Sequence, residues 1–243
     1  MTTLNVNALE PEGGTTSMGV GLSGQNTIIG GNTIKLNTLK DAGGNTIFTS
    51  DGSGNLSSVN SGFGSPLVMI QSQTASADSA ISFTSNIDST YNQYIFRFYN
   101  IHPATNDTYF TFQTSIDGGS NYNVTLTSTA FWASHNESDS NAELMYDNTG
   151  TYDRAQETTF QPLTHSIQND SDAAMSGSLH IFNPSSTTYA KNWYAETNTM
   201  GSGYSINTFT AGYFDTTSAI NAVQFKMWSG NTDAGIIKMF GMK

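Results

Sequence analysis

The chain has 243 residues, of which 36% are hydrophobic and only 11% are charged. Its 19 acidic residues against 8 basic ones give a formal net charge of −11. This balance argues against nucleic acids and anionic membranes as partners, because both attract clustered lysine and arginine. Cysteine is absent, so disulfides, thiol catalysis and thiolate zinc sites are excluded.

The N-terminal residues show no targeting segment. Met1–Pro11 contains neither a basic region nor the run of about 7–15 apolar residues that a secretory signal requires. No stretch approaches the ~18 consecutive apolar residues of a membrane-spanning helix. The sequence therefore predicts a protein that is made in the cytoplasm and does not insert into a membrane.

Residues 1–64 differ from the rest of the chain in composition. No aromatic residue precedes Phe48, and Leu4–Gly14 aligns with Ile34–Gly44 at an offset of 30 residues. Such repeated units lack a core and are stabilised by stacking on neighbours or on other copies of the chain. The alternative is a disordered leader rich in Gly, Ser, Thr and Asn, against which the periodic aliphatic residues argue. The aliphatic residues of this predicted assembly arm are Leu4, Val6, Leu9, Ile34, Leu36, Leu39 and Ile47.

The remainder of the chain predicts a β-sandwich. A turn-rich connector over residues 50–66 places the boundary near residue 65, and helical periodicity is absent apart from short turns around Asp139–Leu144. The expected strands are Leu67–Gln73, Ala80–Thr84, Tyr94–Ile101, Tyr109–Ile116, Tyr122–Ser128, Gly177–Phe182, Thr188–Thr197 and Asn207–Tyr213. We therefore predict an all-β chain, with a short N-terminal repeat arm of β-strands at residues 1–64 and an antiparallel jelly-roll-like β-sandwich at residues 65–243.

The C-terminal residues predict the last two strands of the sandwich. Two alternating runs, Ala222–Trp228 and Ile236–Phe240, flank a set of turn-forming residues, so we expect them to pair as an antiparallel hairpin. A second hairpin is expected where Tyr109–Ile116 runs into a double-glycine turn before Tyr122. The core residues expected in the C-terminal hairpin are Phe225, Met227, Ile237 and Met239.

Motifs that carry catalysis are absent from the sequence. It contains no Gly-x-Ser-x-Gly elbow, His-Glu-x-x-His helix, Walker loop or dinucleotide fingerprint. The four histidines, His102, His135, His165 and His180, share no metal-ligand spacing. The acidic residues of 137–157 and of Asn169–Asp172 leave glycoside hydrolysis and calcium binding at Asp170 and Asp172 as alternatives that the sequence does not favour.

One aromatic residue stands apart from the expected strands. Trp132 lies in Ala130–His135, at the start of the longest non-periodic stretch, residues 132–157. Long loops on a rigid sandwich commonly carry binding residues, and an aromatic face attracts the apolar C–H surface of a sugar. We therefore predict a distal binding rim formed by Trp132 and His135.

Several stretches resemble proteins from one group of viruses. The run Lys40-Asp-Ala-Gly-Gly-Asn-Thr-Ile-Phe-Thr-Ser-Asp-Gly-Ser-Gly-Asn-Leu56 resembles the Gly/Asn-rich β-repeat leader of fibre-type virion proteins from tailed phages of marine bacteria. The rest of the chain resembles proteins of the same phages in Ala80–Thr90, Ile101–Asn106, Thr114–Asn123, Ile181–Thr188 and Gln224–Asn231. The family has no catalytic motif to carry over to this chain.

This resemblance implies a non-enzymatic structural protein on the virion surface, without metal or cofactor. It implies a homotrimer whose arm attaches to other virion proteins and whose sandwich projects outward and binds a host-surface glycan. Tail fibre and capsid decoration (or head fibre) are both consistent with it. A free carbohydrate-binding module is the alternative from another class, and the missing signal peptide and the coreless arm disfavour it.

Overall fold

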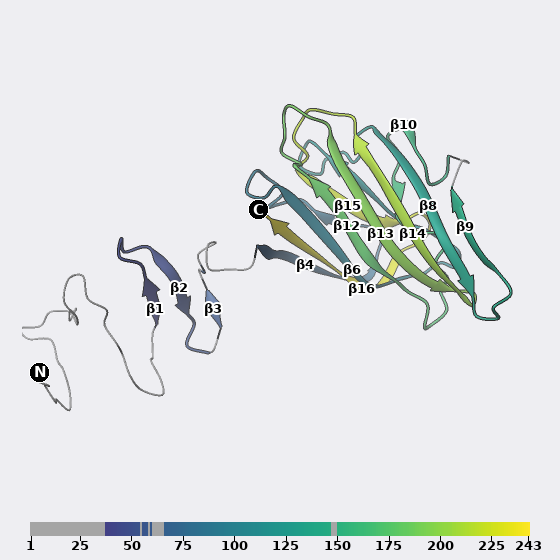
Figure 1. The fold of residues 1–243 in the computed structure, drawn as a ribbon, viewed down its shortest axis with the longest axis horizontal. Helices are drawn as coiled ribbons and strands as arrows, with labels where there is room; N and C mark the ends of the chain where they lie inside the picture. The colour runs from purple at the N-terminus through teal and green to yellow at the C-terminus, as the bar shows by residue number, and fades with distance from the viewer. Residues whose placement is uncertain (1–36, 54, 58, 60–65, 147–149) are drawn as a thin grey trace, which may run out of the picture. The chain divides into compact units, whose positions relative to one another are not determined.

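The computed structural model describes residues 37–53, 55–57, 59, 66–146 and 150–243, and every regular element in these ranges is a β-strand (Figure 1). The chain divides into two compact units, Met1–Phe63 and Gly64–Lys243. Of the predicted arm residues, Leu39 and Ile47 lie within the described ranges. The others lie outside them: Leu4, Val6, Leu9, Ile34 and Leu36.

The first unit contains a small antiparallel sheet. Its strands, in the order β1-β2-β3, are β1 (Thr38–Lys40), β2 (Thr46–Ser50) and β3 (Leu56–Ser57). Leu39 stands opposite Phe48 in the pairing of β1 with β2. Leu39, Ile47 and Phe48 are each half-buried, and no side chain described in this unit is fully buried. The described part of the unit therefore has no core of its own.

The same five-residue turn occurs in both units. In each copy, one carboxylate oxygen of an aspartate accepts a hydrogen bond from the backbone N–H of an asparagine four residues later, and the other oxygen accepts one from the asparagine side-chain amide. The N···O distances lie between 2.7 and 3.1 Å. Each turn contains a glycine at positive φ, which is the fourth residue of the first turn (Gly44, 82°) and the second residue of the other two (Gly52, 80°, and Gly118, 73°). The pairs are Asp41 with Asn45, Asp51 with Asn55, and Asp117 with Asn121.

The second unit is a sandwich of two antiparallel sheets. The large sheet has the order β10-β8-β14-β13-β12-β6-β16-β4, with β9 also paired to β8, and the small sheet has the order β11-β7-β15-β5. The large sheet consists of β4 (Leu67–Asp78), β6 (Gln93–Pro103), β8 (Leu126–Asn136), β9 (Ala142–Tyr146), β10 (Ala155–Glu157), β12 (Met175–Phe182), β13 (Lys191–Gly201), β14 (Tyr204–Phe214) and β16 (Thr232–Met242). The small sheet consists of β5 (Ile81–Phe83), β7 (Phe110–Ser115), β11 (Gln161–Pro162) and β15 (Ala222–Met227).

The core between the two sheets is largely aromatic and centres on Phe225 of β15. Its ring centroid lies 5.2 Å from that of Phe96 and 5.3 Å from that of Phe98, both on β6 of the large sheet. Within the small sheet it meets Phe83 edge-on at 6.1 Å and stacks on Phe110 at 5.7 Å. All five side chains are at most 1% exposed. Since each aromatic side chain buries about 150–250 Å², this cluster supplies a large share of the hydrophobic stabilisation.

The C-terminal strands differ from the predicted hairpin, although the four predicted core residues are all buried. β15 pairs with β7 and β5 in the small sheet, whereas β16 pairs with β4 and β6 in the large sheet. The segment between them crosses the edge of the sandwich, where Trp228 N–H donates to Tyr109 O and Ala104 N–H donates to Asn231 O. The double-glycine turn after β7 also joins the two sheets, since the next strand is β8. The hairpin expected there is therefore wrong too.

The stretch 132–157 is not the long loop that the sequence predicted. β8 continues to Asn136, β9 occupies part of the stretch expected to form helical turns, and β10 follows. The turn between β8 and β9 is closed by Asn136, whose side-chain oxygen accepts hydrogen bonds from the N–H groups of Ser140 and Asn141 at 2.9 and 3.0 Å. Every residue of β9 is exposed, so the strand lacks the apolar–polar alternation by which a half-buried strand is found.

The turn at Asp117 makes the stability of the sandwich depend on pH in the acid range. Hydrogen bonds from Ser115 and Asn121 lower the pKa of the Asp117 carboxyl from 3.8 to about 2. A carboxyl whose pKa is lowered by folding contributes stability that is complete above its unfolded pKa and is lost as the pH falls through its folded pKa. We expect the free energy of unfolding to fall less between about pH 4 and pH 2 in Asp117→Ala than in the wild type, as measured by urea denaturation.

The matched control is Asp215→Ala, which removes an exposed carboxylate outside this turn. Its pH profile shows the dependence that remains when a carboxylate outside the turn is removed. An Asp117→Ala profile parallel to that of the wild type would show that the turn forms equally well with a neutral side chain.

Candidate functional site

Near β9, the inner side of β8 and β14 in the large sheet is covered by loops rather than by strands of the small sheet. Trp132 of β8 points inward and contacts Tyr152 and His165, both from the segment between β9 and β12. The backbone N–H of His165 donates to Thr208 Oγ1 of β14 at 3.1 Å, which holds the loop against the sheet. A cleft of about 490 Å³ remains between them. This overhang cleft is lined by residues that include Asp107, Trp132, Glu143, Met145, His165 and Tyr204.

A cluster of rings forms the inner wall of the overhang cleft. The Trp132 ring centroid lies 5.0 Å from that of His165 and 5.4 Å from that of Tyr152. Tyr152 and His165 stack at 5.6 Å with an interplanar angle of 11°, and Tyr109 meets Tyr152 edge-on at 5.3 Å. Trp132 is only 9% exposed, so it acts chiefly as a packed wall. Met145 and Tyr204 are more exposed and offer apolar surface to a ligand.

The polar lining of the overhang cleft is acidic. Glu143 Oε1 accepts a hydrogen bond from Ser134 Oγ at 3.4 Å, and Asp107 Oδ1 accepts one from Ser166 Oγ. Neither lysine nor arginine is among the described residues that line it. Carboxylates without basic neighbours favour ligands that donate hydrogen bonds, such as polyhydroxylated or amino-bearing molecules, and disfavour anions.

The two residues of the predicted rim lie on opposite faces of β8. Trp132 faces the inner side, whereas His135 is exposed and its Nε2 lies 3.0 Å from Asp139 Oδ1 in the turn before β9. Residues an odd number of positions apart in a strand point in opposite directions. The structure therefore does not bring Trp132 and His135 into one surface, and of the two only Trp132 lines a cleft.

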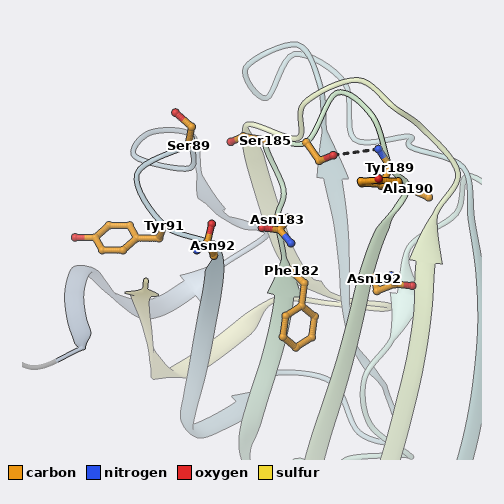
Figure 2. Close-up of a pocket in the computed structure, with 10 residues that line it drawn as sticks. Ser89, Tyr91, Asn92, Phe182, Asn183, Ser185, Tyr189, Ala190 and Asn192 are labelled. Carbon is orange, nitrogen blue, oxygen red and sulfur yellow. Dashed lines mark hydrogen bonds between the residues drawn. The ribbon is translucent and has the colours of Figure 1, made fainter.

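A second groove lies at one end of the sandwich, between the residues before β6 and the connection from β12 to β13 (Figure 2). Its volume is about 510 Å³, and its lining contains Tyr91, Phe182 and Tyr189 together with serines and asparagines. Figure 2 shows Asn92 and Asn183 lying between Tyr91 on one side and Tyr189 on the other. The sequence analysis missed this loop groove, although tyrosines next to Ser- and Asn-rich turns were a signal for it.

The residues considered for metals do not form a cluster of ligands. No group of three or more His, Asp or Glu residues that could hold a metal ion occurs in the described ranges. His102 Nε2 lies 3.1 Å from the backbone oxygen of Asp170, and His102 Nδ1 lies 3.7 Å from Asp233 Oδ2. His180 stacks on Tyr194 with ring centroids 4.5 Å apart, and burial together with the charge of Arg97 lowers its pKa.

Comparison with known protein families, with curated proteins and with solved structures gave no significant match to this chain. Within the described residues there is no helix that is long and apolar enough to cross a membrane.

The placement of Trp132 and His135 predicts that their substitution changes the free energy of unfolding by very different amounts. Trp132→Ala should lower the free energy of unfolding by ~3–5 kcal/mol, because it leaves a cavity among Tyr152, His165 and Ala130. His135→Ala should change it by less than about 0.5 kcal/mol, since only an exposed contact is lost. Urea denaturation of both variants measures the difference, and equal effects would contradict the inward orientation of Trp132.

Proposed function

We propose that this chain is a non-enzymatic structural protein on the surface of a tailed-phage virion. In this proposal it is a trimeric fibre- or knob-type appendage, and its second unit binds a host-surface glycan in the overhang cleft. The resemblance of Lys40–Leu56 to the leaders of fibre-type proteins supports the first part. The observation that carries the second is an acidic, aromatic-walled cleft whose described lining contains neither lysine nor arginine.

The strand order supports a jelly-roll sandwich. Without β8, β9, β10, β13 and β14, the large sheet has the order β4-β16-β6-β12, and the small sheet has the order β5-β15-β7-β11. Along the chain these strands alternate between the sheets, except that β7 is followed by β11 in the same small sheet. The two C-terminal strands return to lie between earlier ones, β15 between β5 and β7 and β16 between β4 and β6. That is the arrangement of two interlocked Greek keys. Jelly rolls occur in viral capsid and lectin domains, both of which fit the proposal, but the fold alone does not define a function.

The chemistry of the overhang cleft supports a glycan rather than a reaction. A sugar presents apolar C–H faces, which suit Met145 and the Tyr204 ring, and hydroxyl groups, which suit the carboxylates of Asp107 and Glu143. The cleft is large enough for a small ligand, since such sites commonly measure ~300–1,000 Å³.

The first unit of the chain supports the proposed trimer. Leu39 and Phe48 lie on one face of the small sheet of this unit and Ile47 lies on the other. All three are half-buried, and the described part of the unit has no core to cover them. Three copies would bury these side chains against one another. Light scattering on the full-length protein should give three times the chain mass of 26.1 kDa, and Leu39→Asp should shift this mass downward. A monomeric full-length protein would contradict the trimer.

The location on the virion can be tested by labelling. Antibodies raised against residues 66–243 should bind intact particles of the phage that encodes the chain, in electron micrographs of purified virions. Label at the tail supports the fibre, and label over the head replaces it with a decoration protein or head fibre. Absence of label from intact particles, with the protein found free in the lysate, would favour a free carbohydrate-binding module.

A competition experiment tests the proposed binding of a host-surface glycan. Purified full-length protein should compete with the phage for adsorption to host cells, and Tyr204→Ala with Glu143→Gln should compete poorly. The control is Tyr146→Ala, an exposed residue of β9 that does not line the cleft. Equal competition by all variants would place the receptor site elsewhere.

A further inference from the structure

We infer that the loop groove is a binding site for an uncharged saccharide. The inference is independent of the virion role, because it rests on the lining and rigidity of this groove alone. The groove lies at the opposite end of β13 from the overhang cleft: Asn192, near the start of β13, lines the loop groove, and Gly201, its last residue, lines the cleft.

None of the described residues that line the loop groove has an acidic, basic or histidine side chain. Three aromatic residues, Tyr91, Phe182 and Tyr189, are combined with the amides of Asn92, Asn183 and Asn192 and with serine hydroxyls. An ion entering such a groove would lose hydration without gaining a counter-charge. A neutral sugar fits both parts of the lining, since its C–H faces pack on rings and its hydroxyl groups bond with amides, which both donate and accept.

The walls of the groove are held in place before any ligand binds. Asn183 N–H donates to Asn92 O at 2.6 Å, which ties the two loops together, and Asn92 N–H donates to Met242 O of β16 at 3.1 Å. On the other side, Asn183 O accepts from Ser186 N–H at 2.9 Å, closing a turn with Pro184 at its second position. A preformed site loses little conformational entropy on binding, which is what a weakly binding neutral ligand requires.

The two tyrosines of the loop groove are held in place by different contacts. Tyr91 meets Tyr94 edge-on, with ring centroids 5.8 Å apart, and its ring lies so close to Gly241 of β16 that a Cβ there would overlap it. Tyr189 is 74% exposed, while its backbone N–H donates to Ser186 Oγ at 3.0 Å, the dashed line in Figure 2. A large, exposed aromatic side chain on a fixed backbone beside a groove is a surface on which a sugar ring can stack.

Binding can be measured with the full-length protein on an array of neutral and anionic glycans, followed by calorimetry with the neutral oligosaccharide that is retained best. We expect neutral glycans to be retained and anionic ones not. Tyr189→Ala should weaken binding of that oligosaccharide by at least about tenfold, equivalent to ~1.4 kcal/mol. Tyr189→Phe should retain it, because the ring remains.

Two further variants separate this site from the rest of the molecule. Tyr146→Ala, on the exposed strand β9 and outside the described lining of both grooves, should leave binding unchanged. Gly241→Ala should weaken binding, since the added methyl group displaces the Tyr91 ring. The inference is overturned if no neutral glycan is retained or if Tyr189→Ala binds as tightly as the wild type.

Discussion

The sandwich depends on the placement of Phe225 among rings from both sheets. Its neighbours come from β5, β6 and β7, which lie far before β15 in the sequence. β15 lies between β5 and β7 in the small sheet, and β16 lies between β4 and β6 in the large sheet. The fold is consequently held by contacts between residues far apart in sequence, which indicates slow folding.

The overhang cleft follows from the unequal size of the two sheets. The small sheet covers only part of the large one, and near β9 the inner side of β8 and β14 is covered by loops and by the ring cluster of Trp132, Tyr152 and His165. Loops leave gaps that a second sheet would fill, and the overhang cleft is such a gap. The loop groove lies at the opposite end of β13, where β12 and β16 end level with each other, since Phe182 and Met242 both stand opposite Gln93, and its lining comes mainly from the loops before β6 and after β12.

The sequence predicted the side-chain environment better than the pairing of strands. Alternation placed Phe225, Met227, Ile237 and Met239 in the core, because it reports which face of a strand is apolar. Alternation does not show which strand lies next to another. β15 and β16, which lie in opposite sheets, were therefore predicted to form a hairpin. The sequence placed Trp132 at the start of a long loop because the strand β9, which is fully exposed, shows no apolar–polar alternation. The loop groove is lined by residues nearly a hundred positions apart in the sequence. A local sequence pattern cannot show that such residues lie close together in the fold.

The distance between the two grooves limits what a ligand can do. Asn192 and Gly201 are nine steps apart on β13, which corresponds to ~30 Å at about 3.3 Å per residue. β13 pairs with β14 in unbroken register along its whole length, so this spacing is fixed. If both grooves hold saccharides, a short oligosaccharide occupies only one of them, whereas a long polysaccharide can occupy both. Binding to the polymer would then gain from effective concentration, and would depend on whether its repeats match the spacing.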